Sequence, residues 1–258
     1  MGNLTDRVAI VTGGMGGIGA ATARALLAEG ALVAVVDIDV STGPERFSDV
    51  DPERMTFVQA DTGDYEQVRA AVAATVDRFG RLDIIFNNAG IGIAKPLLDH
   101  DPETDYHRLI RINQDGVYYG ILEAARQFAS QGGGGVIINT SSIYGEMADD
   151  AVFSYSASKA AVLSFTRSAA FELAKQETRV VAVVPGRVRT PMLEQFGPEM
   201  NALFATEQLR GRQTEPEEVA AVVAFLASDV ANSINGTAVH VEDGYSVFKS
   251  RGVTLEAQ

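Results

Sequence analysis

Residues 8–19 read Val8-Ala9-Ile10-Val11-Thr12-Gly13-Gly14-Met15-Gly16-Gly17-Ile18-Gly19. A short β-branched run leads directly into a glycine-rich turn, and the segment from Ile18 to Glu29 that follows has helical periodicity. Glycines let a backbone approach a pyrophosphate, and the N-terminus of the next helix offers free N–H groups and the positive end of the helix dipole. A glycine-rich turn alone is weak evidence, but its place between a first strand and a first helix predicts a dinucleotide-binding βαβ unit.

Strands and helices continue to alternate beyond this unit. The predicted strands are short and almost wholly apolar, which is typical of a parallel sheet covered by helices on both faces. We therefore predict an α/β fold, a Rossmann-type doubly wound parallel sheet of about seven strands. No Pro-, Gly- or Ser-rich linker divides the chain, which indicates a single domain over residues 1–258. The predicted strands are 8–11, 32–37, 56–59, 82–86, 136–139, 180–184 and 237–241, and the predicted helices are 18–29, 65–79, 103–129, 153–175 and 217–227.

The least regular stretch, residues 187–213, follows the strand that ends at Val184. Ligands of open parallel sheets bind beyond the carboxyl ends of the strands, where a long excursion of the chain can cover them. This stretch is therefore a candidate substrate lid, although an idle surface insertion has the same sequence signature.

Composition and charge exclude several classes of function. The 258 residues include no cysteine, which excludes disulfides, thiolate metal sites and cysteine nucleophiles. The net charge of −13 argues against a nucleic-acid partner, because such binding depends on basic groups on phosphates. Three scattered histidines, His100, His107 and His240, predict no metal site. No apolar run approaches the roughly 20 residues that cross a bilayer, and the chain does not start with an apolar targeting segment, so we expect a cytoplasmic protein without membrane contact.

The second predicted strand ends in Asp37, about twenty residues beyond the glycine-rich turn. A carboxylate at this place accepts hydrogen bonds from both hydroxyls of the adenosine ribose and repels a 2′-phosphate. No Arg or Lys lies at Gly14 or directly after Asp37 to neutralise such a phosphate. The pattern predicts NAD rather than NADP as the cofactor.

Tyr155 and Lys159 lie one turn apart on one face of a predicted helix. An ammonium beside a phenol, together with the positive nicotinamide, favours the phenolate and lowers the pKa of the phenol toward working pH. Such a tyrosine can exchange a proton with an alcohol or a ketone while the nicotinamide carries the hydride. Upstream, a strand ends in Thr140-Ser141-Ser142, where the Ser142 hydroxyl can donate to a developing oxyanion and Ser141 better suits a turn.

Taken together, these motifs resemble the short-chain dehydrogenase/reductase family in its Tyr-x-x-x-Lys type. The resemblance runs from Val8 to Gly244 and implies a nicotinamide-dependent alcohol dehydrogenase or ketone reductase. The motifs that carry it are Thr12–Gly19, Asp61-Thr62, Asn87-Asn88-Ala89-Gly90, Asn113, Ser142, Tyr155, Lys159, and Pro185-Gly186 leading to Thr190.

The resemblance implies a catalytic set of four residues, Asn113, Ser142, Tyr155 and Lys159. Tyr155 is the general acid/base, and Ser142 polarises the carbonyl. Lys159 also binds the nicotinamide ribose, and Asn113 holds a water that links Lys159 to solvent.

The resemblance also implies a set of cofactor-binding residues. Asp61 and Thr62 border the adenine, Asn87 and Gly90 shape the floor of the cleft, and Thr190 meets the carboxamide. The implied cofactor-binding set is Gly13, Met15, Gly17, Ile18, Gly19, Asp37, Asp61, Thr62, Asn88, Ala89, Gly90, Tyr155, Lys159, Pro185, Gly186, Val188 and Thr190.

The positions beside the catalytic motifs and the lid are mostly apolar, so we expect an uncharged ketone or secondary alcohol as substrate. Arg187, directly after Pro185-Gly186, is the exception. It either points to solvent, which is the simpler expectation, or pairs with the carboxylate of a keto acid. The predicted lining residues are Ile93, Ile143, Met147, Phe153, Met192, Phe196 and Leu203.

Other functions remain open at this point. A non-catalytic dinucleotide sensor would keep the glycine-rich turn without needing all four catalytic residues, and a keto-acid reductase would use Arg187. Epimerases, dehydratases and enoyl reductases of the family resemble this chain less, because they have another glycine spacing, a longer chain or a wider Tyr-to-Lys spacing. The chain departs from the family pattern at Thr62, where many members have Val, and at Glu242–Tyr245, where many have a second Gly; neither departure touches the proposed chemistry.

The resemblance finally implies a homotetramer in which the helices that hold Asn113 and Tyr155 pack against a partner chain. The second of these helices has a face of small residues that permits close approach of another helix. The same face would fit equally well against the chain's own sheet. Its members are Ala157, Ala160, Ala161, Ser164 and Ser168.

Overall fold

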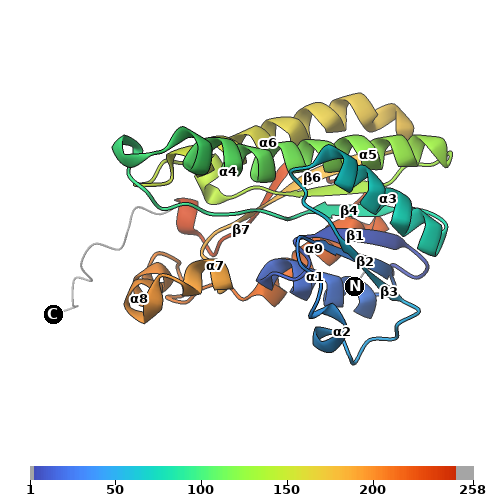
Figure 1. Ribbon diagram of the computed structural model, residues 1–258, viewed down its shortest axis with the longest axis horizontal. Helices are drawn as coiled ribbons and strands as arrows, with labels where there is room; N and C mark the ends of the chain where they lie inside the picture. The colour runs from blue at the N-terminus through green and yellow to red at the C-terminus, as the bar shows by residue number, and fades with distance from the viewer. Residues whose placement is uncertain (1–2, 248–258) are drawn as a thin grey trace.

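The computed structural model describes residues 3–247. Its centre is a sheet of seven parallel strands in the order β3-β2-β1-β4-β5-β6-β7, which confirms the predicted Rossmann-type α/β fold (Figure 1). The ends of the predicted 1–258 domain, residues 1–2 and 248–258, lie outside the described residues. The strands are β1 (Val8–Thr12), β2 (Leu32–Asp37), β3 (Met55–Gln59), β4 (Ile84–Asn87), β5 (Val136–Thr140), β6 (Arg179–Pro185) and β7 (Ala238–Val241).

The order of the strands reverses at β1. The chain builds β1, β2 and β3 toward one side, returns to the other side of β1, and then builds β4 to β7 outward. Val11 of β1 therefore pairs with Val35 of β2 on one side and with Phe86 of β4 on the other. A crevice forms beyond the carboxyl ends of the strands at such a reversal, and this is where open α/β sheets bind ligands.

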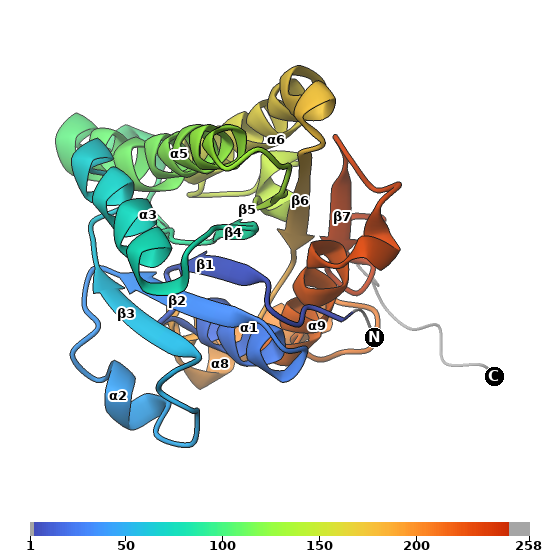
Figure 2. The same ribbon diagram turned by 90° about the vertical axis from the view of Figure 1, so that its right-hand side faces the viewer.

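Helices cover both faces of the sheet (Figure 2). On one face α1 and α9 pack against each other, and Leu26 of α1 and Val223 of α9 join the same apolar cluster. On the other face α3, α5 and α6 contribute Val72, Ile121 and Val162 to a second cluster. The helices are α1 (Gly17–Ala28), α2 (Gly43–Arg46), α3 (Tyr65–Phe79), α4 (Arg108–Ile110), α5 (Gly116–Ser130), α6 (Phe153–Leu173), α7 (Pro191–Glu194), α8 (Gly197–Thr206) and α9 (Pro216–Ala227).

The ends of α3 show how local sequence sets an element. The Asp64 carboxylate accepts hydrogen bonds from the backbone N–H groups of Glu66 and Gln67 and so caps the start of the helix. Gly80 follows the last turn with a φ of 84°, a left-handed conformation that favours glycine. The chain then turns back toward β4.

The helix predicted over 103–129 is wound unevenly. Residues 102–130 are helical, but π-helical turns at Pro102–His107 and Arg111–Asp115 flank the short α4 before α5 begins. A π-helical turn inserts one residue into the helix and recurs at functional sites. The second of these turns contains Asn113, one of the predicted catalytic residues.

The candidate lid is more regular than its sequence indicated. Residues 187–213 contain α7 and α8, so the expectation of an irregular stretch is wrong for 191–194 and 197–206. Backbone hydrogen bonds join the two ends of the excursion: Arg189 N donates to Thr214 O over 2.9 Å, and Thr214 N donates to Arg187 O over 2.9 Å. Among the described residues 3–247, no helix has the length and apolarity needed to cross a membrane.

Candidate active site

The predicted site residues gather at one edge of the sheet. The glycine-rich turn follows β1, Asn88–Gly90 follows β4, Ser142 lies just beyond β5, and Pro185-Gly186 ends β6. Helix α6 reaches the same edge, because the Lys159 ammonium donates to the carbonyl oxygen of Thr140 at the end of β5 over 2.9 Å. The tertiary structure therefore brings the predicted cofactor and catalytic residues together.

The glycine-rich turn is too tight for side chains. Gly13 has a φ of 61°, and a Cβ added there would lie 2.8 Å from Ala89 Cα. A Cβ on Gly19 would lie 2.1 Å from the Gly13 carbonyl oxygen. The Thr12 hydroxyl accepts hydrogen bonds from the N–H groups of Asn88 and Ala89, at 2.9 and 3.1 Å, and so ties the turn to the end of β4.

The start of α1 fits an anionic ligand. No side chain caps it, and its first turn contains no acidic residue, so its N–H groups and the positive end of its dipole are available to a phosphate. Gly17 faces Thr190, whose Cγ2 would lie 2.8 Å from a Cβ at Gly17. Met15 and Ile18 lie within the Thr12–Gly19 segment, and their partly buried side chains pack against the core.

Asp37 lies at the end of β2 with its carboxylate held beside the turn. One oxygen accepts from Met15 N over 2.9 Å and the other accepts from Ile38 N over 2.8 Å. Arg46 of α2 donates to the Met15 carbonyl oxygen over 2.9 Å. A basic side chain thus stands near the turn although none was found in the sequence directly after Asp37.

Asp61 and Thr62 follow β3 and lie against the helical segment that contains Arg111 and Gly116. Arg111 Nη1 lies 3.2 Å from Asp61 Oδ2. A Cβ on Gly116 would lie 3.0 Å from the Thr62 carbonyl oxygen. These contacts fix both residues in place, and their role beside an adenine stays a prediction.

Asn87 and Asn88 have different environments at the end of β4. The Asn88 side-chain amide donates to the Thr12 carbonyl oxygen over 3.0 Å and so supports the glycine-rich turn. Asn87 is only 2% exposed, and its amide donates to Asn139 Oδ1 in the adjacent strand over 2.9 Å. Asn87 therefore joins β4 to β5 within the sheet, and its role in the floor of the cofactor cleft stays a prediction.

Burial acts in opposite directions on the pKa values of Tyr155 and Lys159. It lowers the pKa of Lys159, which is 3% exposed, to about 8. It raises the pKa of Tyr155, while a hydrogen bond with Ser142 and the charge of Arg187 act to lower it. The Lys159 ammonium lies 5.7 Å from the centroid of the Tyr155 ring. Desolvation is the largest of these effects on the phenol. The lowered pKa that the sequence predicts includes the positive charge of a nicotinamide and stays a prediction.

Gly90 lies where Asn113 and Lys159 meet. A Cβ on Gly90 would lie 3.2 Å from Asn113 Oδ1 and 3.5 Å from Lys159 Nζ. The Asn113 amide is engaged with the backbone of Ile91, since Oδ1 accepts from Ile91 N and Nδ2 donates to Ile91 O, both over 2.8 Å. Asn113 therefore holds the segment after β4 against the helix, and its predicted hold on a water stays a prediction.

The two serines after β5 have different contacts, and the turn-forming role expected of Ser141 falls to Ser142. Ser141 Oγ donates to the Lys159 carbonyl oxygen over 2.8 Å, so it joins β5 to α6. Ser142 Oγ accepts from Tyr144 N over 3.2 Å, which leaves its own O–H to donate to a ligand.

Pro185 and Gly186 lead from β6 into the lid. A Cβ on Gly186 would lie 2.8 Å from Gln208 Oε1, so the backbone packs directly beneath the lid. Val188 is buried in the core, and the Thr190 hydroxyl donates to the Val188 carbonyl oxygen over 3.4 Å.

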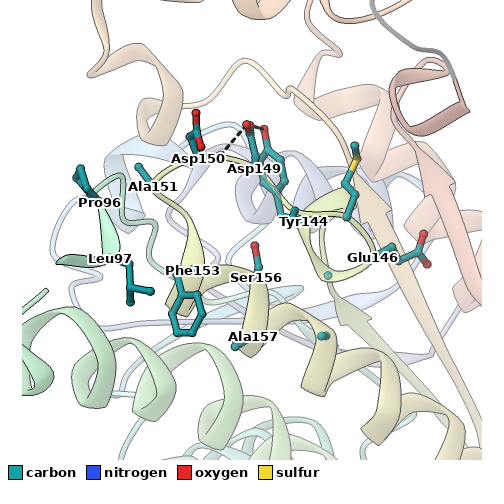
Figure 3. A pocket seen from close by; sticks show the side chains of 14 residues that line it. Pro96, Leu97, Tyr144, Glu146, Asp149, Asp150, Ala151, Phe153, Ser156 and Ala157 are labelled. Carbon is teal, nitrogen blue, oxygen red and sulfur yellow. Dashed lines mark hydrogen bonds between the residues drawn. The ribbon is translucent and has the colours of Figure 1, made fainter. Parts of the chain in front are cut away.

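A cavity of about 780 Å³ opens beside the start of α6 (Figure 3). Of the predicted substrate-lining residues, Met147 and Phe153 line it. Figure 3 shows the carboxylates of Asp149 and Asp150 across the cavity from the Phe153 ring. Ser156 also lines the cavity, whereas Tyr155 does not. The nearest link to the catalytic group is Tyr144, which lines the cavity and whose ring centroid lies 6.5 Å from that of Tyr155.

Ile143 and Met192, two of the other predicted lining residues, have different environments. Ile143 is 1% exposed and packs in an apolar cluster with Leu163 and Val184, so its assignment to the substrate pocket is wrong. Met192 approaches the segment after β4, where its sulfur would lie 3.3 Å from a Cβ on Gly92.

The remaining lining predictions are Phe196, Leu203 and Ile93. Phe196, just before α8, packs against Phe204 with the ring centroids 5.8 Å apart, and Leu203 of α8 is exposed. Ile93 is partly buried. No contact with a substrate is defined for these residues, so their roles stay predictions.

Arg187 does not point to solvent, and the simpler of the two expectations for it is wrong. The residue is 9% exposed, and its guanidinium lies 3.9 Å from the Phe204 ring centroid and 5.3 Å from that of Tyr144. Its Nε donates to Glu207 over 2.6 Å. The aromatic rings and the carboxylate come from distant parts of the chain, which is why the sequence could not orient this side chain.

Several residues of the site were missed by the sequence reading. Thr140 offers only its backbone carbonyl oxygen, so no side-chain motif could reveal it. Arg46 contacts Met15 and Arg111 contacts Asp61 only in the folded chain, so no motif in the sequence indicates either contact. Within residues 3–247 no group of three or more His, Cys, Asp or Glu side chains is arranged to hold a metal ion.

Comparison with known proteins finds similarity over most of the chain. A family model described as enoyl-(acyl carrier protein) reductase matches residues 13–246. Levodione reductase from Leifsonia aquatica is 38% identical and the alignment covers 94% of this chain and 95% of that protein. Cis-4-hydroxycyclohexanecarboxylate dehydrogenase from Sinomonas cyclohexanicum is 40% identical over 93% of this chain and 97% of that protein. The crystal structure of a short-chain type dehydrogenase/reductase from Mycobacterium marinum has a TM-score of 0.90 and 31% identity, covering 95% of this chain and 97% of that one.

Proposed function

Because this chain belongs to the short-chain dehydrogenase/reductase family, it is an oxidoreductase that interconverts an alcohol and a ketone with a nicotinamide dinucleotide, and we propose that it uses NAD and an uncharged substrate. The observation that carries the proposal is the meeting of Tyr155, Lys159 and Ser142 at the sheet edge that also holds the glycine-rich turn.

The residues of the cofactor cleft fit a dinucleotide. The glycines of the turn leave room for a pyrophosphate, and the uncapped start of α1 offers it N–H donors. Asp37, fixed by Met15 N and Ile38 N, would accept hydrogen bonds from the adenosine ribose and repel a 2′-phosphate. The bound dinucleotide would supply or accept the hydride.

The chain's own residues account for the proton and for the polarisation of the carbonyl. In reduction, the protonated Tyr155 phenol donates its proton to the substrate oxygen, and in oxidation the phenolate takes that proton back. The Ser142 hydroxyl donates to the same oxygen. The Lys159 ammonium, held by the Thr140 carbonyl, stabilises the phenolate electrostatically.

The substrate we propose is an uncharged cyclic ketone or secondary alcohol. Levodione reductase and cis-4-hydroxycyclohexanecarboxylate dehydrogenase are both named for ring compounds, and Met147 and Phe153 offer apolar surface in the cavity beside the start of α6. The second of these names contains a carboxylate, so a keto acid is the alternative, with Arg187 as its partner. A sensor without catalysis is disfavoured because all four catalytic residues are present.

An absorbance assay of the nicotinamide tests this function. Cyclic ketones and secondary alcohols are each supplied with NAD(H) and with NADP(H), and an enoyl thioester serves as the contrasting substrate. We expect turnover of the alcohols and ketones with NAD(H) and none of the thioester. Turnover of the thioester alone would contradict the proposal.

We also propose a homotetramer built through α5 and α6. The small-residue face of α6 points away from the chain's own sheet, because Ala157, Ala160 and Ser164 are exposed. The opposite face, with Val162 and Leu163, is the one that packs inward. This leaves the small residues available to a second copy. A cytoplasmic location stays a prediction from the sequence.

A further inference from the structure

Arg187 stands in an enclosure built from four separate parts of the chain. It follows β6, and its guanidinium faces Tyr144 from the segment after β5, Tyr245 from the segment after β7, and Phe204 of α8, at 5.3, 5.6 and 3.9 Å from their ring centroids. Stacking on aromatic rings orients a guanidinium and leaves its N–H groups to be satisfied at the edge.

Two carboxylates occupy that edge. Glu207, just beyond α8, accepts from Arg187 Nε over 2.6 Å. Asp149 lies 3.7 Å from Arg187 Nη2 and also accepts from the Tyr144 hydroxyl over 2.6 Å, the bond drawn in Figure 3. A single positive charge thus faces two negative charges. Asp150 adds a third carboxylate to the wall of the neighbouring cavity.

We propose that Glu207 is a specificity-determining residue: by occupying the guanidinium of Arg187, it prevents that cation from binding a substrate carboxylate and makes the site select uncharged ketones over keto acids. The inference rests on the proposed function, whose substrate class it explains. A keto acid would have to displace Glu207, and it would then meet Asp149 as well as the displaced carboxylate.

Glu207 is the movable member of the pair. Its side chain is 36% exposed, whereas that of Arg187 is 11% exposed and enclosed by rings. Glu207 follows α8, and no residue of that helix is buried. The Glu207→Gln change removes the negative charge, yet the amide oxygen can still accept from Arg187 Nε. This variant therefore exposes the cation to a ligand while the contact geometry stays in place.

A binding experiment tests the inference without requiring turnover. Isothermal titration calorimetry on the NAD-loaded protein measures the dissociation constants of cyclohexanecarboxylate and of cyclohexanecarboxamide. The carboxamide has nearly the same shape as the carboxylate and no charge. We expect the wild-type protein to favour the carboxamide, and Glu207→Gln to move the ratio of the two dissociation constants about tenfold toward the carboxylate, a shift of about 1.4 kcal/mol.

Two variants control for charge and for the cation. Glu199→Gln removes a negative charge from α8 at an exposed position in its first turn and should leave the ratio within about twofold of wild type. Arg187→Met in the Glu207→Gln background should abolish the gain, because no cation is left to bind the carboxylate.

The ratio of the two dissociation constants decides the inference. A shift of this ratio by threefold or more in Glu207→Gln that is absent in both controls supports it. Any of four results overturns it: the wild-type protein prefers the carboxylate; the ratio of dissociation constants shifts by less than threefold; the ratio shifts equally in Glu199→Gln; or Glu207→Gln shows no measurable binding of the carboxylate. Reduction of 4-oxocyclohexanecarboxamide by the wild-type protein is measured alongside. Failure of that reaction counts against the proposed function, whereas the binding ratio alone decides the role of Glu207.

Discussion

Tyr155 and Lys159 share one face of α6, where Tyr155 is partly buried and Lys159 is buried, and desolvation favours the neutral form of each side chain. Burial raises the pKa of the phenol and lowers that of the ammonium, because a low-dielectric surrounding disfavours whichever form carries charge. The phenol is therefore held as a proton donor, which suits the reduction of a ketone at neutral pH. Oxidation needs the phenolate, so its rate should rise with pH.

Tyr155→Phe removes the transferable proton and leaves the ring in place. We expect turnover to fall by about 10²–10⁴-fold, near the upper end, because no other acid is proposed to reach the substrate oxygen. Binding of NAD should stay close to wild type, since the phenol acts in the chemistry. Steady-state kinetics and a titration with NAD measure the two effects, and a variant that keeps about a third of wild-type turnover would refute the assignment.

Lys159→Met should stabilise the cofactor-free protein at neutral pH. The pKa of this lysine falls from 10.5 to about 8 on folding, so below pH 8 the folded state holds a buried cation that costs about 3 kcal/mol. As the pH rises from 8 toward 10.5 the folded state binds fewer protons than the unfolded state, and the cost disappears. Thermal melts of both proteins at pH 7 and pH 10 measure this. The gain of the variant should be larger at pH 7, and an equal gain at both pH values contradicts the argument.

Asp37→Ser should weaken the preference for NAD by removing the charge that repels a 2′-phosphate. Arg46, which already reaches the Met15 carbonyl oxygen, then becomes the nearest cation for that phosphate. We expect kcat/KM with NADP to rise about tenfold, equivalent to about 1.4 kcal/mol. Adding Arg46→Ala should remove that gain, and a gain that survives it would place the phosphate elsewhere. Comparable kcat/KM for NAD and NADP in the wild-type protein would refute the NAD preference itself.

At the scale of elements, α8 differs from the helices that cover the sheet. It has no buried residue, whereas α1 buries six, including Ala23 and Leu26. Its attachment depends on polar contacts such as the buried Gln208, whose Oε1 accepts from Arg187 N over 2.9 Å. Few apolar contacts make an element open at low free-energy cost, which is the behaviour required of a lid.

Hydrogen exchange measured by mass spectrometry tests the lid. We expect the amides of 197–206 to exchange faster than those of 17–28 in the free protein, because α8 lacks apolar burial. Addition of NAD and a substrate analogue together should slow exchange in 197–206, with α1 as the internal reference. Equal protection of both helices with no response to ligands would mean that the excursion is an inert insertion.

At the scale of the whole molecule, the outward face of α6 is the region that suits a second copy. Sedimentation velocity should show a tetramer at micromolar concentration. Ala160→Glu places a charge on the exposed small-residue face and should dissociate the assembly, because a charge buried between close helices is costly. Ala73→Glu on the exposed side of α3 is the matched control and should leave the tetramer intact. A wild-type monomer would refute the association.

The order of strands and helices could be predicted because each depends on local pattern. Apolar β-branched runs gave the strands within one or two residues, and helical periodicity gave α1, α3, α6 and α9. The π-helical turn at Arg111–Asp115 and the helices α7 and α8 were missed. Their sequences carry no strong apolar periodicity, since their conformation depends on contacts with the rest of the fold.

The sequence by itself determined the α/β class, the position of the glycine-rich turn, and the identity of Asp37, Tyr155 and Lys159 as candidate site residues. Each of these follows from spacing along the chain, which folding does not alter. Only the tertiary structure decided that Ile143 belongs to the core and that Arg187 faces inward to Glu207. The orientation of a side chain depends on the surfaces that distant segments present to it, and a linear pattern contains no information about where those segments meet.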